Sequence, residues 1–136
     1  MNKIVLAVSD QWTPDARVDS IADFASRLGH PIIAVHVAYG TEGSGADTIP
    51  GEQVLELIAT QLRGKGIKVE TLLLFSDDLG EAILKTAEEH KATMLILGLS
   101  SKGMLTRLIE GNVANQIIRG ARMPVLLLPP DWSTPI

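Results

Sequence analysis

The chain has 136 residues, 46% of them hydrophobic and 21% charged, so it can bury one substantial core but is too short for two ordinary domains. Its net charge of −4 argues against the broad basic surface that nucleic acids require, and its lack of cysteine excludes disulfides, thiolate metal sites and cysteine nucleophiles. Its apolar runs are far shorter than the roughly 20 residues that cross a bilayer, and no secretory signal pattern precedes them. We therefore expect one soluble, cytoplasmic domain that associates with neither membranes nor nucleic acids.

Short apolar runs alternate with stretches of helical periodicity along the whole chain. This alternation is typical of successive βαβ units and predicts an α/β fold with an open, mostly parallel, five-stranded sheet and four helices. Runs that are nearly all apolar suit strands that are covered by helices on both faces. The predicted strands are Ile4–Val8, Ile32–Val37, Val69–Phe75, Met94–Leu97 and Val125–Leu128.

The first two helices have clear start or stop signals. Thr13 is the expected N-cap of the first helix, with Pro14 at the first helical position and Gly29 as the stop. Its predicted inward stripe consists of Val18, Ile21, Ala22, Ala25 and Leu28. The second helix is predicted from about Pro50 to Arg63, after a long polar loop.

The third and fourth helices follow the last two predicted crossovers. Asp78 is the expected N-cap of the third helix, because Glu81 stands three residues later as in a capping box. The fourth helix is predicted to start at Gly111 and Asn112. Its expected buried residues are Val113, Ala114, Ile117, Ile118 and Ala121.

A ligand site is expected where the segments after the first and fourth strands meet. In an open parallel sheet, ligands bind beyond the carboxyl ends of the strands, where the winding direction reverses. The fourth helix would direct its unpaired N–H groups and the positive end of its dipole at this point, which favours a phosphate. The candidate residues from the two segments are Ser9 and Asp10, then Leu97, Gly98, Ser101, Lys102, Arg107, Gly111 and Asn112.

These residues resemble the universal stress protein family over essentially the whole chain, most strongly over residues 92–129. The resemblance is carried by the stretches KIVLAV, AVHV, DDLGEAILKTA and TMLILGLSSKGMLTRLIEGNVANQIIRGARMPVLLLP. The resemblance implies a doubly wound sheet of strand order 3-2-1-4-5. It also implies an adenine nucleotide such as ATP or AMP as ligand, with Val37 lying against the adenine.

The chain departs from the motif of the nucleotide-binding members at three positions. That motif has a glycine, two residues, a second glycine, nine residues, and a third glycine followed by serine or threonine. Gly98 and Gly111 match, whereas Ser101 and Asn112 replace the second glycine and the hydroxyl residue. The aspartate that closes the first strand in such members is Ser9 here, with Asp10 one place later.

Two interpretations therefore stay open. If the backbone at Ser101 is left-handed, the serine costs about 1–2 kcal/mol, which is roughly tenfold in affinity. With negative φ it costs nothing and adds a hydroxyl donor. The first interpretation is an adenine nucleotide-binding stress protein, with at most very slow hydrolysis because no Walker motif is present. The second is a dimeric interaction module that binds no nucleotide.

Four further residues could carry chemistry in other interpretations of the sequence. Trp12 is expected to cover the end of the sheet rather than stack on a base, and His36 to be a hydrogen-bonded core residue rather than a catalyst. No histidine has a partner at metal-ligand spacing, so no metal site is predicted. A receiver domain built on Asp77 and Asp78 would need an acidic pair after the first strand and a lysine after the last, and the sequence has neither.

The last strand is predicted to form a homodimer interface. An uncovered apolar strand at a sheet edge is a template for pairing with another chain, and family members pair similarly. The predicted interface residues are Pro124, Val125, Leu126, Leu127 and Leu128. For the tail DWSTPI that follows, two placements are considered, over the partner or free in solvent.

Overall fold

All the predicted strands form one parallel sheet in the computed structural model, which describes residues 2–9, 12, 14–39, 48–98, 113–129 and 132–136. The strand order is β3-β2-β1-β4-β5, and all four pairings are parallel, which confirms the predicted fold class and order. The strands are β1 (Ile4–Ala7), β2 (Ile32–Tyr39), β3 (Val69–Ser76), β4 (Met94–Gly98) and β5 (Val125–Leu128).

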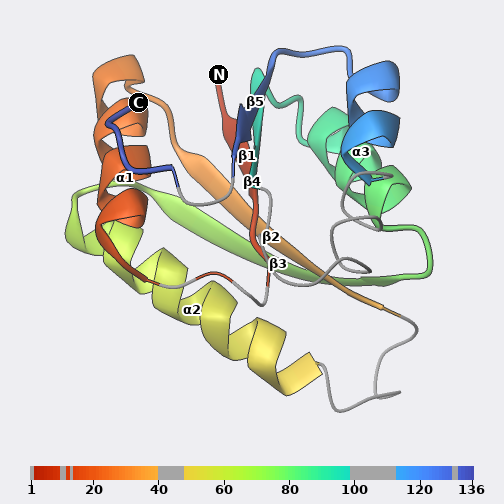
Figure 1. Ribbon diagram of the computed structural model, residues 1–136, viewed down its shortest axis with the longest axis horizontal. Helices are drawn as coiled ribbons and strands as arrows, with labels where there is room; N and C mark the ends of the chain where they lie inside the picture. The colour runs from red at the N-terminus through yellow and green to blue at the C-terminus, as the bar shows by residue number, and fades with distance from the viewer. Residues whose placement is uncertain (1, 10–11, 13, 40–47, 99–112, 130–131) are drawn as a thin grey trace.

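Helices cover both faces of the sheet. α1 (Ala16–Leu28) and α2 (Thr48–Gly64) lie on one face, and α3 (Leu79–Glu89) lies on the other with the helix of residues 113–120, called helix 113–120 below (Figure 1). Alternate residues of β1 therefore enter different cores, because successive side chains of a strand point to opposite faces. Ile4 and Leu6 join the cluster under α1 and α2, and Val5 and Ala7 join the cluster under α3 and helix 113–120.

The first helix starts later than predicted. Its N-cap is Asp15, whose carboxylate accepts the backbone N–H of Arg17 at 2.9 Å, so Pro14 precedes the cap and the prediction of Thr13 was wrong. The Arg17 side chain adds an ion pair to the same carboxylate at 2.8 Å. Gly29 ends the helix in the left-handed conformation, as predicted. Leu28 was assigned to the buried stripe, but it is exposed.

α3 has the predicted N-cap, and the predicted buried face of helix 113–120 is confirmed only in part. Asp78 accepts the backbone N–H of Glu81 at 3.1 Å, while its own N–H donates to Ser76 Oγ at 3.0 Å. In helix 113–120, Ala114 and Ile117 are buried as expected. Ile118 is 53% exposed, so its assignment to the core was wrong. Val113 and Ala121 are half-buried, and the predicted start at Gly111 and Asn112 lies outside the described residues.

The residues after β5 return to α1 (Figure 1). Trp132 and Ile136 pack against the buried cluster of the α1 and α2 face, and the Arg27 side chain donates a hydrogen bond to the backbone oxygen of Ile136. Residues 132–136 of the tail therefore pack on their own chain, and the placement free in solvent was wrong. The apolar surface of Trp132 explains the difference, because the edge of this core accommodates it.

Candidate functional site

Four of the predicted site residues come together at the carboxyl edge of the sheet. β1 lies between β2 and β4, with Ala7 level with Val35 on one side and with Leu97 on the other. Ser9 lies two residues beyond the end of β1, Val37 lies two residues beyond Val35 in β2, and Gly98 ends β4. The chain leaves β1 toward β2 on one side and reaches β4 on the other, so this edge is a point where the winding reverses.

The other predicted site residues lie outside the described part of the chain. They are Asp10, Ser101, Lys102, Arg107, Gly111 and Asn112.

The face of the edge toward α3 has an apolar floor. Val37 and Leu97 are buried and belong, with Ala7, to the cluster under α3 and helix 113–120. They come from β2, β4 and β1, so three neighbouring strands build this floor together. Such a surface suits the flat apolar face of an aromatic ligand, with polar backbone groups at the strand ends to orient it.

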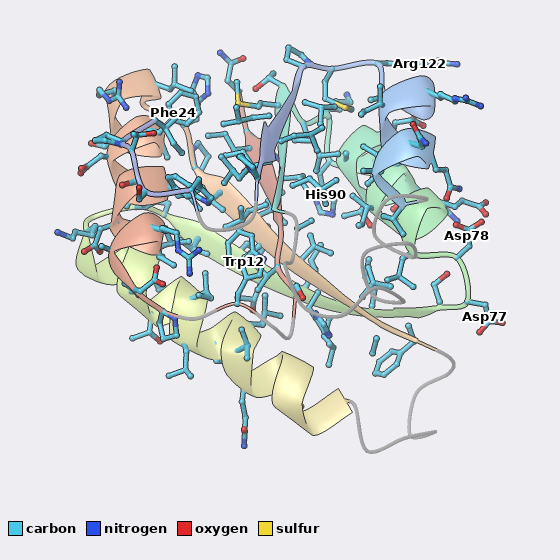
Figure 2. All side chains as sticks on the ribbon, viewed as in Figure 1. Trp12, Phe24, Asp77, Asp78, His90 and Arg122 are labelled. Carbon is cyan, nitrogen blue, oxygen red and sulfur yellow. The ribbon has the colours of Figure 1, made fainter. Side chains whose placement is uncertain are left out.

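Trp12 closes the opposite face of the same edge. It packs against the cluster under α1 and α2 (Figure 2) and contacts Gly98. A Cβ atom at Gly98 would stand 2.6 Å from Cζ2 and 3.2 Å from Nε1 of the Trp12 indole. The expectation that Trp12 covers the sheet end is thus confirmed. Gly98 was predicted only as a residue of the ligand site, and its contact with the Trp12 ring was not predicted.

His36 fills the neighbouring position on the Trp12 face. It is 7% exposed, and its Nδ1 lies 2.8 Å from the carbonyl oxygen of Val8. A carbonyl oxygen only accepts, so we assign the proton to Nδ1. Its ring lies against α2, where a Cβ at Gly51 would stand 2.1 Å from Nε2. The interpretation of His36 as a hydrogen-bonded core residue is confirmed.

Helix 113–120 is fixed to α3 at the same end of the sheet. Gln116 Nε2 donates to the Asp78 carboxylate at 3.1 Å, and Gly80 leaves the space that the Gln116 side chain occupies. Asp78 follows β3 and caps α3, so the first turn of α3 lies at the carboxyl edge of the sheet. It lies beside one end of helix 113–120 (Figure 2). The bond therefore places the amino-terminal turn of helix 113–120 at this edge, where a helix dipole favours anions.

The described residues offer little other chemistry. Within them, no group of three or more histidine and acidic side chains is placed to hold a metal ion. None of the helices in the described ranges combines the length and hydropathy needed to span a bilayer. Away from the site, hydrogen bonding by the Arg17 side chain lowers the pKa of Asp15.

Comparison with known proteins identifies the family of this chain. The model of the universal stress protein family matches residues 1–129. The chain belongs to the universal stress protein family. A universal stress protein of Methanocaldococcus jannaschii is 31% identical over 78 residues, a match that spans 57% of this chain and 45% of that relative.

Solved universal stress proteins share the fold over nearly the full chain. One from Archaeoglobus fulgidus is 27% identical, with a TM-score of 0.75, over 93% of this chain and 98% of that one. A second Archaeoglobus fulgidus structure, in complex with dAMP, is 25% identical, with a TM-score of 0.72, over 93% and 97% of the two chains.

Proposed function

We propose that this universal stress protein is a cytoplasmic stress-response protein that binds an adenine nucleotide, of the ATP or AMP class, at the carboxyl ends of β1 and β4. The observation that carries the proposal is the floor formed by Ala7, Val37 and Leu97 beside the strand ends of Ser9 and Gly98. The relative in complex with dAMP supports the ligand class.

The phosphate part of the ligand is assigned to the amino-terminal end of helix 113–120. The bond from Gln116 to Asp78 supports this, because it holds that end at the same sheet edge. Lys102, Arg107, Gly111 and Asn112 belong to the segment before the helix and are proposed to complete the phosphate contacts. We expect binding without rapid hydrolysis, because the sequence contains no Walker motif.

The test is to denature the purified protein, look for released adenine nucleotide, and titrate the refolded or nucleotide-free protein with AMP, dAMP and ATP. Binding is expected to raise the melting temperature with ligand concentration. Gly111→Asp is expected to abolish that rise, because its carboxylate would repel the phosphate. Gly64→Asp is the matched control, since no atom lies within 4 Å of the position where its Cβ would stand. An empty protein whose melting temperature no nucleotide changes would contradict the proposal.

A second candidate function is an interaction module that binds no nucleotide. Ser101 and Asn112, which replace motif residues of the nucleotide-binding members, favour it. In that case Gly111→Asp would change only the stability of the protein.

We also propose that the protein is a homodimer that pairs through β5. This strand lies at the edge of the sheet, and Val125, Leu126 and Leu127 are only half-buried there. An apolar edge strand with free backbone groups favours pairing with a second copy, and Pro124 at its start limits the pairing to a short stretch.

A further inference from the structure

We propose that Trp12 is a positioning residue for the nucleotide site, because it joins Ser9, just beyond β1, to Gly98, the last residue of β4. The inference rests on the proposed function and adds a residue that the family motif does not contain. Trp12 lies on the face opposite Val37 and Leu97, so it acts through the backbone that it holds rather than by stacking on the base.

The first contact joins Trp12 to Ser9. The backbone N–H of Trp12 donates to the carbonyl oxygen of Ser9 at 3.1 Å. Ser9 is the first residue beyond the buried end of the first strand, and the His36 ring bonds the carbonyl of Val8 just before it. The backbone on this side of the site is therefore held at two successive carbonyl groups.

The second contact joins Trp12 to Gly98. The indole occupies the space where any other residue at position 98 would have its Cβ, 2.6 Å from Cζ2 and 3.1 Å from Cε2. The ring also packs against the buried cluster of the α1 and α2 face, so it has little room to move away. Only glycine at position 98 is compatible with this ring position.

Together the contacts form a continuous path from Ser9 through Trp12 to Gly98. Ser9 lies just beyond β1 and Gly98 ends the neighbouring strand β4, so the two residues flank the proposed ligand. A binding site needs its groups held to within about 0.5 Å, which supporting residues outside the site provide. The Trp12 ring is such a support, since it sets the separation of the two backbones from behind.

The experiment is a double-mutant cycle of Trp12→Leu and Gly98→Ala, with AMP affinity measured by calorimetry and the free energy of unfolding measured in urea. Each single variant is expected to weaken AMP binding about tenfold, because the ring is removed or displaced. In the Trp12→Leu background, Gly98→Ala is expected to cost less than about threefold, because the methyl group then meets no ring.

Trp132→Leu is the matched control. Trp132, the second tryptophan of the chain, packs against the same cluster but comes from the tail. Its replacement is expected to lower the free energy of unfolding and to leave AMP affinity unchanged. NMR of the ligand-free protein gives a second measurement. The Hα protons of Gly98 should show a ring-current shift that is lost in Trp12→Leu and kept in Trp132→Leu.

The outcomes separate this inference from the proposed function. Tight AMP binding that is unaffected by Trp12→Leu, additive losses in the cycle, or a Gly98 Hα shift that is insensitive to Trp12 would each overturn the inference alone. A wild-type protein that binds no AMP, dAMP or ATP would overturn the proposed function, and this inference with it.

Discussion

The ring of His36 lies directly against the α-carbon of Gly51, so β2 and the first turns of α2 approach as closely as an imidazole and a glycine allow. The same ring bonds the carbonyl of Val8 at 2.8 Å. One buried side chain thus connects α2 to the segment that leads from β1 into the site.

Gly51→Ala is expected to destabilise the protein by about 1–3 kcal/mol, because the added methyl group displaces the buried ring and strains its bond to Val8. Urea unfolding measures the change. Gly64→Ala serves as the control in the same helix, since its methyl group meets open space. It should be neutral or stabilising by about 0.5 kcal/mol. Equal effects at the two positions would contradict the close packing.

Lys91→Gly is expected to stabilise the protein by about 1 kcal/mol. Lys91 is the non-glycine residue that the described backbone holds at positive φ, 54°, after the C-cap of α3. A side chain pays a steric cost in this left-handed conformation that glycine does not. Lys91→Ala, which removes the charge but keeps Cβ, should show no such gain. A midpoint of urea unfolding that rises for both variants would mean that the charge, not the backbone, is responsible.

Asp15 should make stability depend on pH in the acidic range. The hydrogen bond from Arg17 lowers the pKa of Asp15 in the folded protein below the unfolded value of about 3.9. A depressed carboxyl pKa contributes stability above the unfolded pKa, and the contribution is lost as pH falls through the folded pKa. The difference in unfolding free energy between wild type and Asp15→Asn should therefore shrink below about pH 4. In Arg17→Ala, the pKa of Asp15 measured by NMR titration should rise.

Leu127→Lys is expected to convert the proposed dimer into a 14.6 kDa monomer in sedimentation velocity. The charge would lie at the half-buried edge strand, where two copies would bring two ammonium groups together. Leu57→Lys is the control, because Leu57 is 54% exposed on α2 and that helix packs on the other side of the sheet, against β2 and β3. A wild-type protein that sediments only as a monomer at micromolar concentration would contradict the dimer.

The fold was predictable because strands that are buried on both faces appear in the sequence as short, nearly continuous apolar runs. Strands such as Met94–Gly98 are apolar runs, and Gly29 and Asp78 carry the cap chemistry that ends or starts a helix. The start of α1 was not predictable, because Thr13 and Asp15 are both acceptable cap residues and the sequence does not distinguish them. Periodicity likewise placed Ile118 next to the core without showing that its neighbours leave it uncovered.

The site was predictable only in part. The ends of parallel strands identify Ser9 and Gly98, since strand ends share one edge, whereas Val37 was predicted only from the resemblance to the family. The contact of Trp12 with Gly98 and the bond from Gln116 to Asp78 depend on which distant segments meet, and on the exact approach of a side chain to a backbone. No short-range pattern records such approaches.

The packing of Trp132 and Ile136 on α1 has a consequence for how the protein is made. α1, which is synthesised before the other described helices, shares its hydrophobic cluster with residues 132–136. On a ribosome, α1 therefore stays incompletely covered until residues 132–136 have left the exit tunnel. Translation must proceed past β5 before this layer of the molecule acquires its full cooperativity.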